Sequence, residues 1–204
     1  QNVSNFIETW VLKQSDWKYP VVYLCPTTLM YTENGIKTNL CYILSNRFDM
    51  GYINAYLKTK KVTLAKQYRH KKLEIHGDIP DMDIPHGQIG SVICLDYVPY
   101  LSLEQVRNLL ESFNNILKPG GSAFIHFSDA DQEAEWNRVV AKKHTYLTQS
   151  LLEQMAVKFD FECEFYHIED FYSFASIKKP GKLDSIKAGP TKIEKIETNK
   201  KTKV

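Results

Sequence analysis

Two segments of the chain combine histidine with aspartate at spacings that could support chemistry. His76 and Asp78 are two residues apart on an expected strand, so both side chains point to the same side and could hold a metal ion. His126 and Asp129 follow an expected strand at the edge where open α/β sheets bind ligands, and either could serve as a general base. His144, beside Tyr146, could face the same cleft from the side of the helices.

Each of these residues also has a structural interpretation that needs no ligand. No third metal ligand accompanies His76, and a hydrogen-bonded surface histidine is the more common case. The sequence contains neither a GxxxxGK[ST] phosphate loop nor a serine in the GxSxG pattern. Hydrolase and nucleotidase functions therefore have no support.

The elements that must position these residues alternate between strands and helices. Continuous apolar runs over 21–25, 40–44 and 92–95 are typical of strands buried on both faces, and further strands are expected over 73–75 and 123–127. Ser102 and Gln105 form a capping-box pattern before a helix with apolar positions from Leu103 to Leu117, which is expected to end at 118–121. Other helices are expected over 4–14, 131–142 and 147–159. Residues 49–68 have apolar positions at helical spacing, and 62–64 within them could extend a helix or form a strand.

This alternation predicts an α/β fold with a doubly wound, mostly parallel sheet. Residues 161–165 alternate in polarity, and together with 172–177 they predict an antiparallel pair at the C-terminal edge. We expect an N-terminal helix or extension over 1–18, lying on the sheet edge, a main domain over 19–180 and a lysine-rich extended tail over 181–204.

Four segments of the sequence resemble parts of one known protein family. GDIPDMDIPHGQIGSVICLDYVPYL at 77–101 resembles the third-to-fourth-strand region of class I S-adenosylmethionine-dependent methyltransferases. LLESFNNILKPGGSAFIHF is similar to the family's next helix, proline-glycine-glycine turn and fifth strand, while HTYLTQSLLEQMAVKFDFECEF and YSFASIKKPG are similar to its last helix and strand pair. The resemblance covers about residues 73–180 and implies a Rossmann-like sheet with an antiparallel C-terminal edge strand.

The resemblance also implies site residues. Asp78 stands where the family's acid accepts a hydrogen bond from the adenine amino group, with Ile79 beside it. Asp96, Tyr97 and Tyr100 follow strand four, where the family's methyl-transfer centre lies, so they are the candidate catalytic residues of an active enzyme. Asp96 is also a candidate for binding the cofactor.

The cofactor half departs from the family pattern. The family has an acid at the end of strand one, then an apolar residue and glycines at alternating places, because the backbone there must approach the methionine moiety closely. Residues 23–29 read YLCPTTL, with neither an acid nor a glycine. Leu44 or Ser45 stands where a carboxylate normally holds the ribose hydroxyls, and Asp49 is the nearest acid downstream. Gly90 replaces the acid that usually opens strand four.

Two functional hypotheses follow from this contrast. The first is a catalytically degenerate methyltransferase-like protein that binds no cofactor and serves as a structural or interaction subunit of a viral or ribonucleoprotein assembly. The second is an active methyltransferase that uses S-adenosylmethionine, in which Asp78 holds adenine, Asp49 and the loop with Asn34 and Gly35 provide an unusual cofactor grip, and the acceptor is unknown.

Charge and composition indicate the partners and the location. Residues 178–204 hold nine lysines against three acids, a net charge of +6, whereas the rest of the chain carries −4. Such a segment stays solvated unless an acidic protein face, RNA or DNA orders it. Because no apolar run reaches the ~20 residues of a membrane span, we expect no membrane contact and a cytoplasmic or other intracellular location, including a virion or organelle assembly.

The four cysteines form no CxxC pair and are expected to be buried small apolar residues. The chain begins with Gln1 rather than methionine, which fits a processed product or a fragment.

Overall fold

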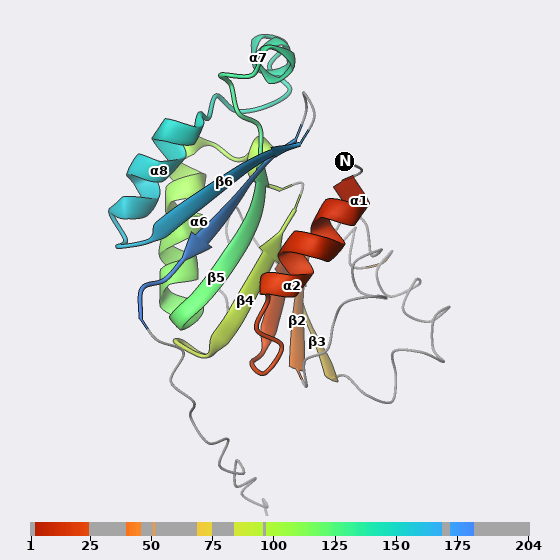
Figure 1. Cartoon of the computed structure of the whole chain (residues 1–204), viewed down its shortest axis with the longest axis vertical. Helices are drawn as coiled ribbons and strands as arrows, with labels where there is room; N and C mark the ends of the chain where they lie inside the picture. Colours follow the sequence, from red (N-terminus) through yellow and green to blue (C-terminus); the bar gives the residue numbers. More distant parts are fainter. Residues whose placement is uncertain are drawn as a thin grey trace, which may run out of the picture.

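The computed structural model describes residues 3–24, 40–45, 69–74, 84–95, 97–168 and 172–181, together with Gly51. These residues form one seven-stranded sheet in the order β3-β2-β1-β4-β5-β7-β6 (Figure 1). The strands are β1 Val21–Leu24, β2 Leu40–Ser45, β3 Arg69–Glu74, β4 Ile89–Cys94, β5 Leu117–Phe127, β6 Glu162–Ile168 and β7 Tyr172–Lys178. The helical segments are α1 Val3–Phe6, η1 Ile7–Val11, α2 Leu12–Gln14, η2 Val98–Tyr100, α6 Leu103–Ile116, α7 Glu133–Val140 and α8 Gln149–Val157.

The pairing confirms the predicted fold class. Strands β1 to β5 are parallel to one another, whereas β7 runs antiparallel to both β5 and β6 and leaves β6 at the sheet edge. The strand order reverses between β1 and β4, which creates the switch point where open α/β sheets bind ligands at the carboxyl ends of their strands.

The buried central strands follow the sequence pattern, and the edge strand β3 departs from it. Every residue of β1 is buried, as expected for a strand between two neighbours and two faces. Strand β3 begins at Arg69, before the apolar residues that suggested a strand over 73–75. Its polar first residues join the sheet because their backbones pair with β2 from Leu40 onwards. Ile75 lies outside the described residues.

Helix α6 begins as predicted and ends earlier. The Ser102 hydroxyl accepts the Gln105 amide at 3.2 Å, and the Gln105 side chain accepts the Ser102 amide at 2.8 Å, which completes the capping box. The expected stop at 118–121 is wrong, because Leu117 is already extended and pairs with Ile89 as the first residue of β5.

The C-terminal end of α6 is closed by a lysine from a distant part of the chain. The Lys179 ammonium donates to the carbonyl of Asn114, in the last turn of α6, and to the carbonyl of Leu117, the first residue of β5. A cation at a helix C-terminus also interacts favourably with the helix dipole. This contact joins the residues after β7 to the helix that precedes β5.

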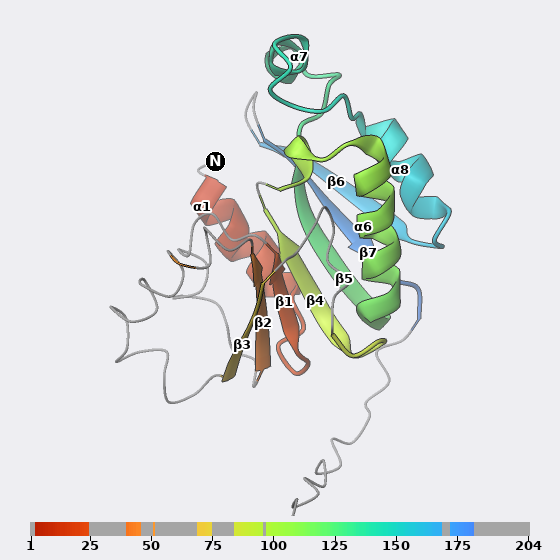
Figure 2. The same ribbon diagram turned by 180° about the vertical axis from the view of Figure 1, so that it is seen from behind.

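The two faces of the sheet carry separate hydrophobic cores. Helices α6 and α8 cover one face (Figure 2). The N-terminal helix, formed by α1, η1 and α2, covers part of the other (Figure 1). Our expectation that it lies on the sheet edge is wrong, since the Trp10 ring is 5.5 Å from Phe124 of β5 and 4.2 Å from Tyr166 of β6. The Phe6 ring lies 5.0 Å from Phe174 of β7. Aromatic packing therefore holds this helix across the face.

The described residues also bear on the predictions about the cysteines and about membrane-spanning helices. Cys41 and Cys94 are buried, as expected, and Cys163 is half-buried, while Cys25 lies outside the described residues. No helix in the described part of the chain is long and apolar enough to cross a bilayer. The tail beyond residue 181 is also outside the described ranges.

Candidate functional site

The side chains at the described strand ends of the switch point are buried and mostly apolar. In the register of the sheet, Leu24 of β1 lies between Leu44 of β2 and Cys94 of β4, and each of the three side chains is at most 1% exposed. Ser45, the last residue of β2, has no exposed surface, and its hydroxyl makes no hydrogen bond to the described residues.

Tyr23 stands where the resemblance places an acid at the end of strand one. Its side chain is 1% exposed and belongs to the core beneath the N-terminal helix, with Val11 and Ile43. Burial raises the pKa of the Tyr23 phenol well above its ordinary value, and the nearby Cys41 raises it further. Tyr23 is therefore a neutral core side chain.

The described ends of β1 and β2 present no accessible acceptor to S-adenosylmethionine. Its ribose diol requires an accessible acceptor, and its methionine ammonium is best matched by negative charge. The positions that should provide them carry the buried hydroxyls of Ser45 and Tyr23. The other predicted cofactor residues, Asp78, Ile79, Asp49 and Asp96, and the 25–29 loop lie outside the described residues.

The two predicted tyrosines after β4 have different environments. Tyr97 is half-buried and packs against the core on the α6 side. Tyr100, at the end of η2, is 65% exposed, and its ring meets the His144 ring edge to face at 5.3 Å. The structure thus brings Tyr100 together with His144, which the sequence had suggested only as a separate candidate.

A buried carboxylate holds His144 in place. Glu135 of α7 is 1% exposed, and its Oε2 lies 3.0 Å from His144 Nδ1. Its Oε1 accepts a hydrogen bond from Arg138 Nη1 at 2.8 Å. The Ser128 hydroxyl lies 2.7 Å from the same nitrogen, His144 Nδ1. A proton relay requires serine and carboxylate on different ring nitrogens, so this arrangement is a structural clamp.

Sequence reasoning missed Ser128 and Glu135. The available signal was an arginine three residues after a glutamate on one helix, a spacing that brings the two side chains together. That spacing is common on solvated helices, and nothing in it indicates that Glu135 is buried.

His126 and Asp129, the candidates for a general base, make packing and backbone contacts in the structure. His126 is 6% exposed and packs 5.5 Å from the ring of Phe174. The Asp129 carboxylate accepts the backbone amides of Asp131 and Gln149 at 3.2 and 3.3 Å, which fixes the segments before α7 and α8. No three acidic, histidine or cysteine side chains in the described ranges are grouped to hold a metal, and His76 is not among those ranges.

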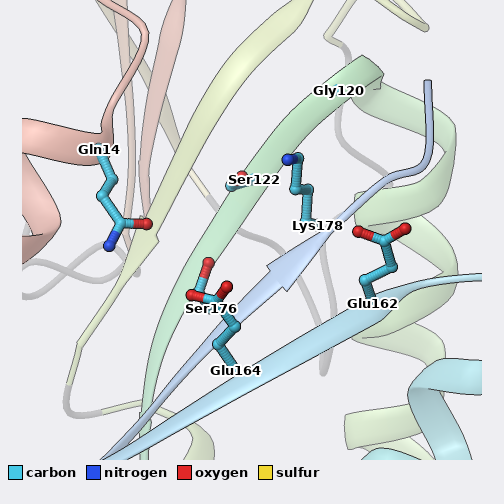
Figure 3. Close-up of a pocket in the computed structure, with 7 residues that line it drawn as sticks. All are labelled: Gln14, Gly120, Ser122, Glu162, Glu164, Ser176 and Lys178. Atoms are coloured by element: carbon cyan, nitrogen blue, oxygen red, sulfur yellow. The ribbon is translucent and has the colours of Figure 1, made fainter. Parts of the chain in front are cut away.

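A polar pocket of about 300 Å³ lies at the other end of the sheet (Figure 3). It lies between the N-terminal helix and the uncovered part of β5, β7 and β6. Its lining residues are Gln14, Gly120, Ser122, Glu162, Glu164, Ser176 and Lys178. Because it lies near the amino end of β5, it is remote from the edge where this class of sheet binds its ligands.

Solved structures show the same fold. No protein-family model matches the sequence, and neither does any curated protein. An O-methyltransferase family protein from Burkholderia thailandensis aligns with a TM-score of 0.69 at 11% identity, over 88% of this chain and 55% of that one. A putative methyltransferase from Bacillus halodurans aligns with a TM-score of 0.66 at 10% identity, over 87% of this chain and 100% of that one.

A third similar structure is a complex of the Haloferax volcanii Trm112 methyltransferase activator and a putative methyltransferase. It aligns with a TM-score of 0.64 at 14% identity, over 86% of this chain and 89% of that chain. The chain spans 55% of the length of the Burkholderia protein. The TM-scores show that the chain has the class I methyltransferase fold. Sequence identities of 10–14% carry no conclusion about its activity.

Proposed function

We propose that this protein is a methyltransferase-fold interaction subunit that transfers no methyl group from S-adenosylmethionine. The observation that carries the proposal is the burial of the last residues of β1, β2 and β4 at the switch point, where Leu24, Ser45 and Cys94 are at most 1% exposed. The lack of glycine over 23–29 supports the same conclusion, because a Cβ at the family's glycine positions would obstruct the methionine moiety.

The proposed setting is a larger intracellular assembly, such as a viral or ribonucleoprotein particle. Two features support a binding role. The segment 178–204 carries a net charge of +6 and could neutralise an acidic protein face or phosphates. One protein of similar fold is found in complex with an activator protein. Deletion of 182–204 should weaken retention in the assembly, and unchanged retention would remove the tail from the proposal.

Ligand binding to the full-length protein tests the loss of the cofactor. We expect titration calorimetry with S-adenosylmethionine and with S-adenosylhomocysteine to give no heat of binding, while a known methyltransferase binds both under the same conditions. Micromolar binding that is lost in Asp78→Ala would contradict the proposal, because Asp78 is the residue that the family resemblance places on adenine.

The second candidate is an active methyltransferase with an unknown acceptor. It is favoured by the position of Tyr97 and Tyr100, which directly follow β4 as the methyl-transfer residues of the family do. Asp96, between β4 and Tyr97, would join them. Ultraviolet crosslinking of labelled S-adenosylmethionine to the wild-type protein, lost in Asp96→Asn, would favour this candidate over the first.

A further inference from the structure

Exposed apolar side chains gather at one place on the described surface. Six large hydrophobic residues of the described surface are more than a third exposed, and four of the six lie there: Tyr100, Trp136, Val140 and Tyr146, with exposures of 65, 47, 61 and 49%. We call these four residues the aromatic patch. They come from η2, α7 and the segment after α7. Soluble proteins seldom group such side chains without a binding role.

Contacts between these segments bring the patch together. The Trp136 and Tyr146 rings meet edge to face at 6.2 Å. The Thr145 amide, next to Tyr146, donates to the Pro99 carbonyl, next to Tyr100, at 2.8 Å. Val140 lies one turn after Trp136 on α7, so the two side chains share a face of the helix.

The frame behind the patch is fixed. Glu135, the neighbour of Trp136, is buried and binds both Arg138 and His144. The Ala130 amide donates to the Leu147 carbonyl at 2.8 Å, which ties the two ends of this region to each other. The aromatic rings are therefore presented on a preorganised support, which lowers the entropy cost of binding.

Unpaired positive charge adjoins the patch. Lys142 and Lys143 are exposed and make no ion pair with the described residues. From Trp136 to Tyr146 the sequence contains Arg138 and these two lysines and no acid. A partner that covers the patch would gain by placing carboxylates beside the lysines, because such complementarity increases association rates and selects the partner.

We propose that the aromatic patch is the docking surface for a protein partner. The partner places an apolar side chain against Trp136 and Tyr146 and directs carboxylates toward Lys142 and Lys143. This inference rests on the proposed interaction function, since it names the surface and the chemistry of the partner.

The composition of the patch favours a protein over a nucleic acid. Tryptophan, tyrosine and arginine are the residues enriched at protein interface hot spots. Val140 offers an aliphatic surface on which a base does not stack.

The test uses a phage-displayed library of random dodecapeptides, selected on the immobilised full-length protein. We expect the enriched peptides to combine aromatic or large aliphatic residues with acids. Trp136→Ser and Tyr146→Ser should each weaken the best peptide about 30-fold, as for central hot-spot residues. Val157→Ser is the matched control, because Val157 is 57% exposed on α8 outside the patch, and it should leave affinity unchanged.

The charge requirement has its own variants. Lys142→Glu with Lys143→Glu should slow association with the acidic peptides and reduce its salt dependence, whereas Lys158→Glu at the end of α8 should change neither. Because all these positions are exposed, circular dichroism should show wild-type folding. The charge variants leave the aromatic rings intact, so they test the surface independently of the serine variants.

Several results would overturn the inference. One is the absence of peptide enrichment, and another is enriched peptides that bind Trp136→Ser as well as the wild type. A third is binding of a poly(uridine) oligonucleotide that depends on Trp136, together with no peptide whose binding depends on Trp136. That result would indicate a nucleic-acid surface. Self-association that Trp136→Ser abolishes would assign the patch to a second copy of the chain. Calorimetry with S-adenosylmethionine is a separate measurement, so failure of the proposed function and failure of the docking surface are distinguishable.

Discussion

Removal of the Glu135 carboxylate should release the region that carries the aromatic patch. Glu135→Ala deletes a group that is 1% exposed and lies 3.0 Å from His144 Nδ1 and 2.8 Å from Arg138 Nη1. Glu135→Gln keeps the shape of the side chain and one acceptor oxygen, but it loses the negative charge. The two variants separate the contribution of the charge from that of packing.

The size of the effect follows from the exposure of the two partners. A buried hydrogen bond to a charged group contributes about 1.5–3 kcal/mol, which applies to the contact with His144, whose side chain is 10% exposed. The Arg138 contact counts for less, about 0.2–1 kcal/mol, because the Arg138 side chain is 41% exposed. We expect a loss of about 2–4 kcal/mol in Glu135→Ala and about half of that in Glu135→Gln.

Amide hydrogen exchange over residues 133–148 measures this loss directly. Because α7 lies outside both hydrophobic cores, the substitution should lower the free energy of local opening of α7 more than the free energy of global unfolding. Protection of α7 should fall about 30- to 1,000-fold in Glu135→Ala. Glu133→Gln, exposed on the same helix, is the matched control. If both Glu135 variants keep the protection of that control, the clamp does not stabilise this region.

Two other perturbations have defined outcomes. Gly90→Ala places a Cβ 2.7 Å from the Tyr19 Cβ and should lower the free energy of unfolding by about 1–3 kcal/mol in urea titrations. Gly51→Ala, whose Cβ would meet none of the described residues within 4 Å, should not lower it. An unchanged urea midpoint in Gly90→Ala would contradict the close packing. Burial, followed by the charge of Glu153, raises the pKa of the Cys163 thiol from 9.0 to about 11, so its alkylation rate in the native protein should keep rising up to that pH, and folding stability should decrease between pH 9 and 11. Glu153→Gln should lower this pKa, and a rate plateau near pH 9 in the wild type would refute the shift.

Much of the fold was predictable because it depends on local periodicity. The continuous apolar run at Val21–Leu24 and the Ser102 capping box act over a few residues, and both are present in the structure. The start of β3 at Arg69 and of β5 at Leu117 depended on backbone pairing with a neighbouring strand, which side-chain patterns do not encode. The position of the N-terminal helix depended on aromatic contacts with strands far along the chain.

The site was less predictable for the same reason. The missing glycines after strand one are visible in the sequence, and they indicated a changed cofactor cleft. The burial of Tyr23 and Ser45 required the assembled sheet and its cover. The clamp joins Ser128, Glu135 and His144 from three separate segments, and the exposure of Trp136 depends on how α7 is held.

The exposed edge of β6 has a consequence for the behaviour of the protein at high concentration. Glu162 and Glu164 project from the same face of this border strand and are both exposed. Two molecules that approached along their β6 borders would bring like charges together, a known natural defence against intermolecular sheet extension. Repulsion between these carboxylates therefore opposes the use of the unpaired edge of β6 as a template for fibrils, even in a crowded solution.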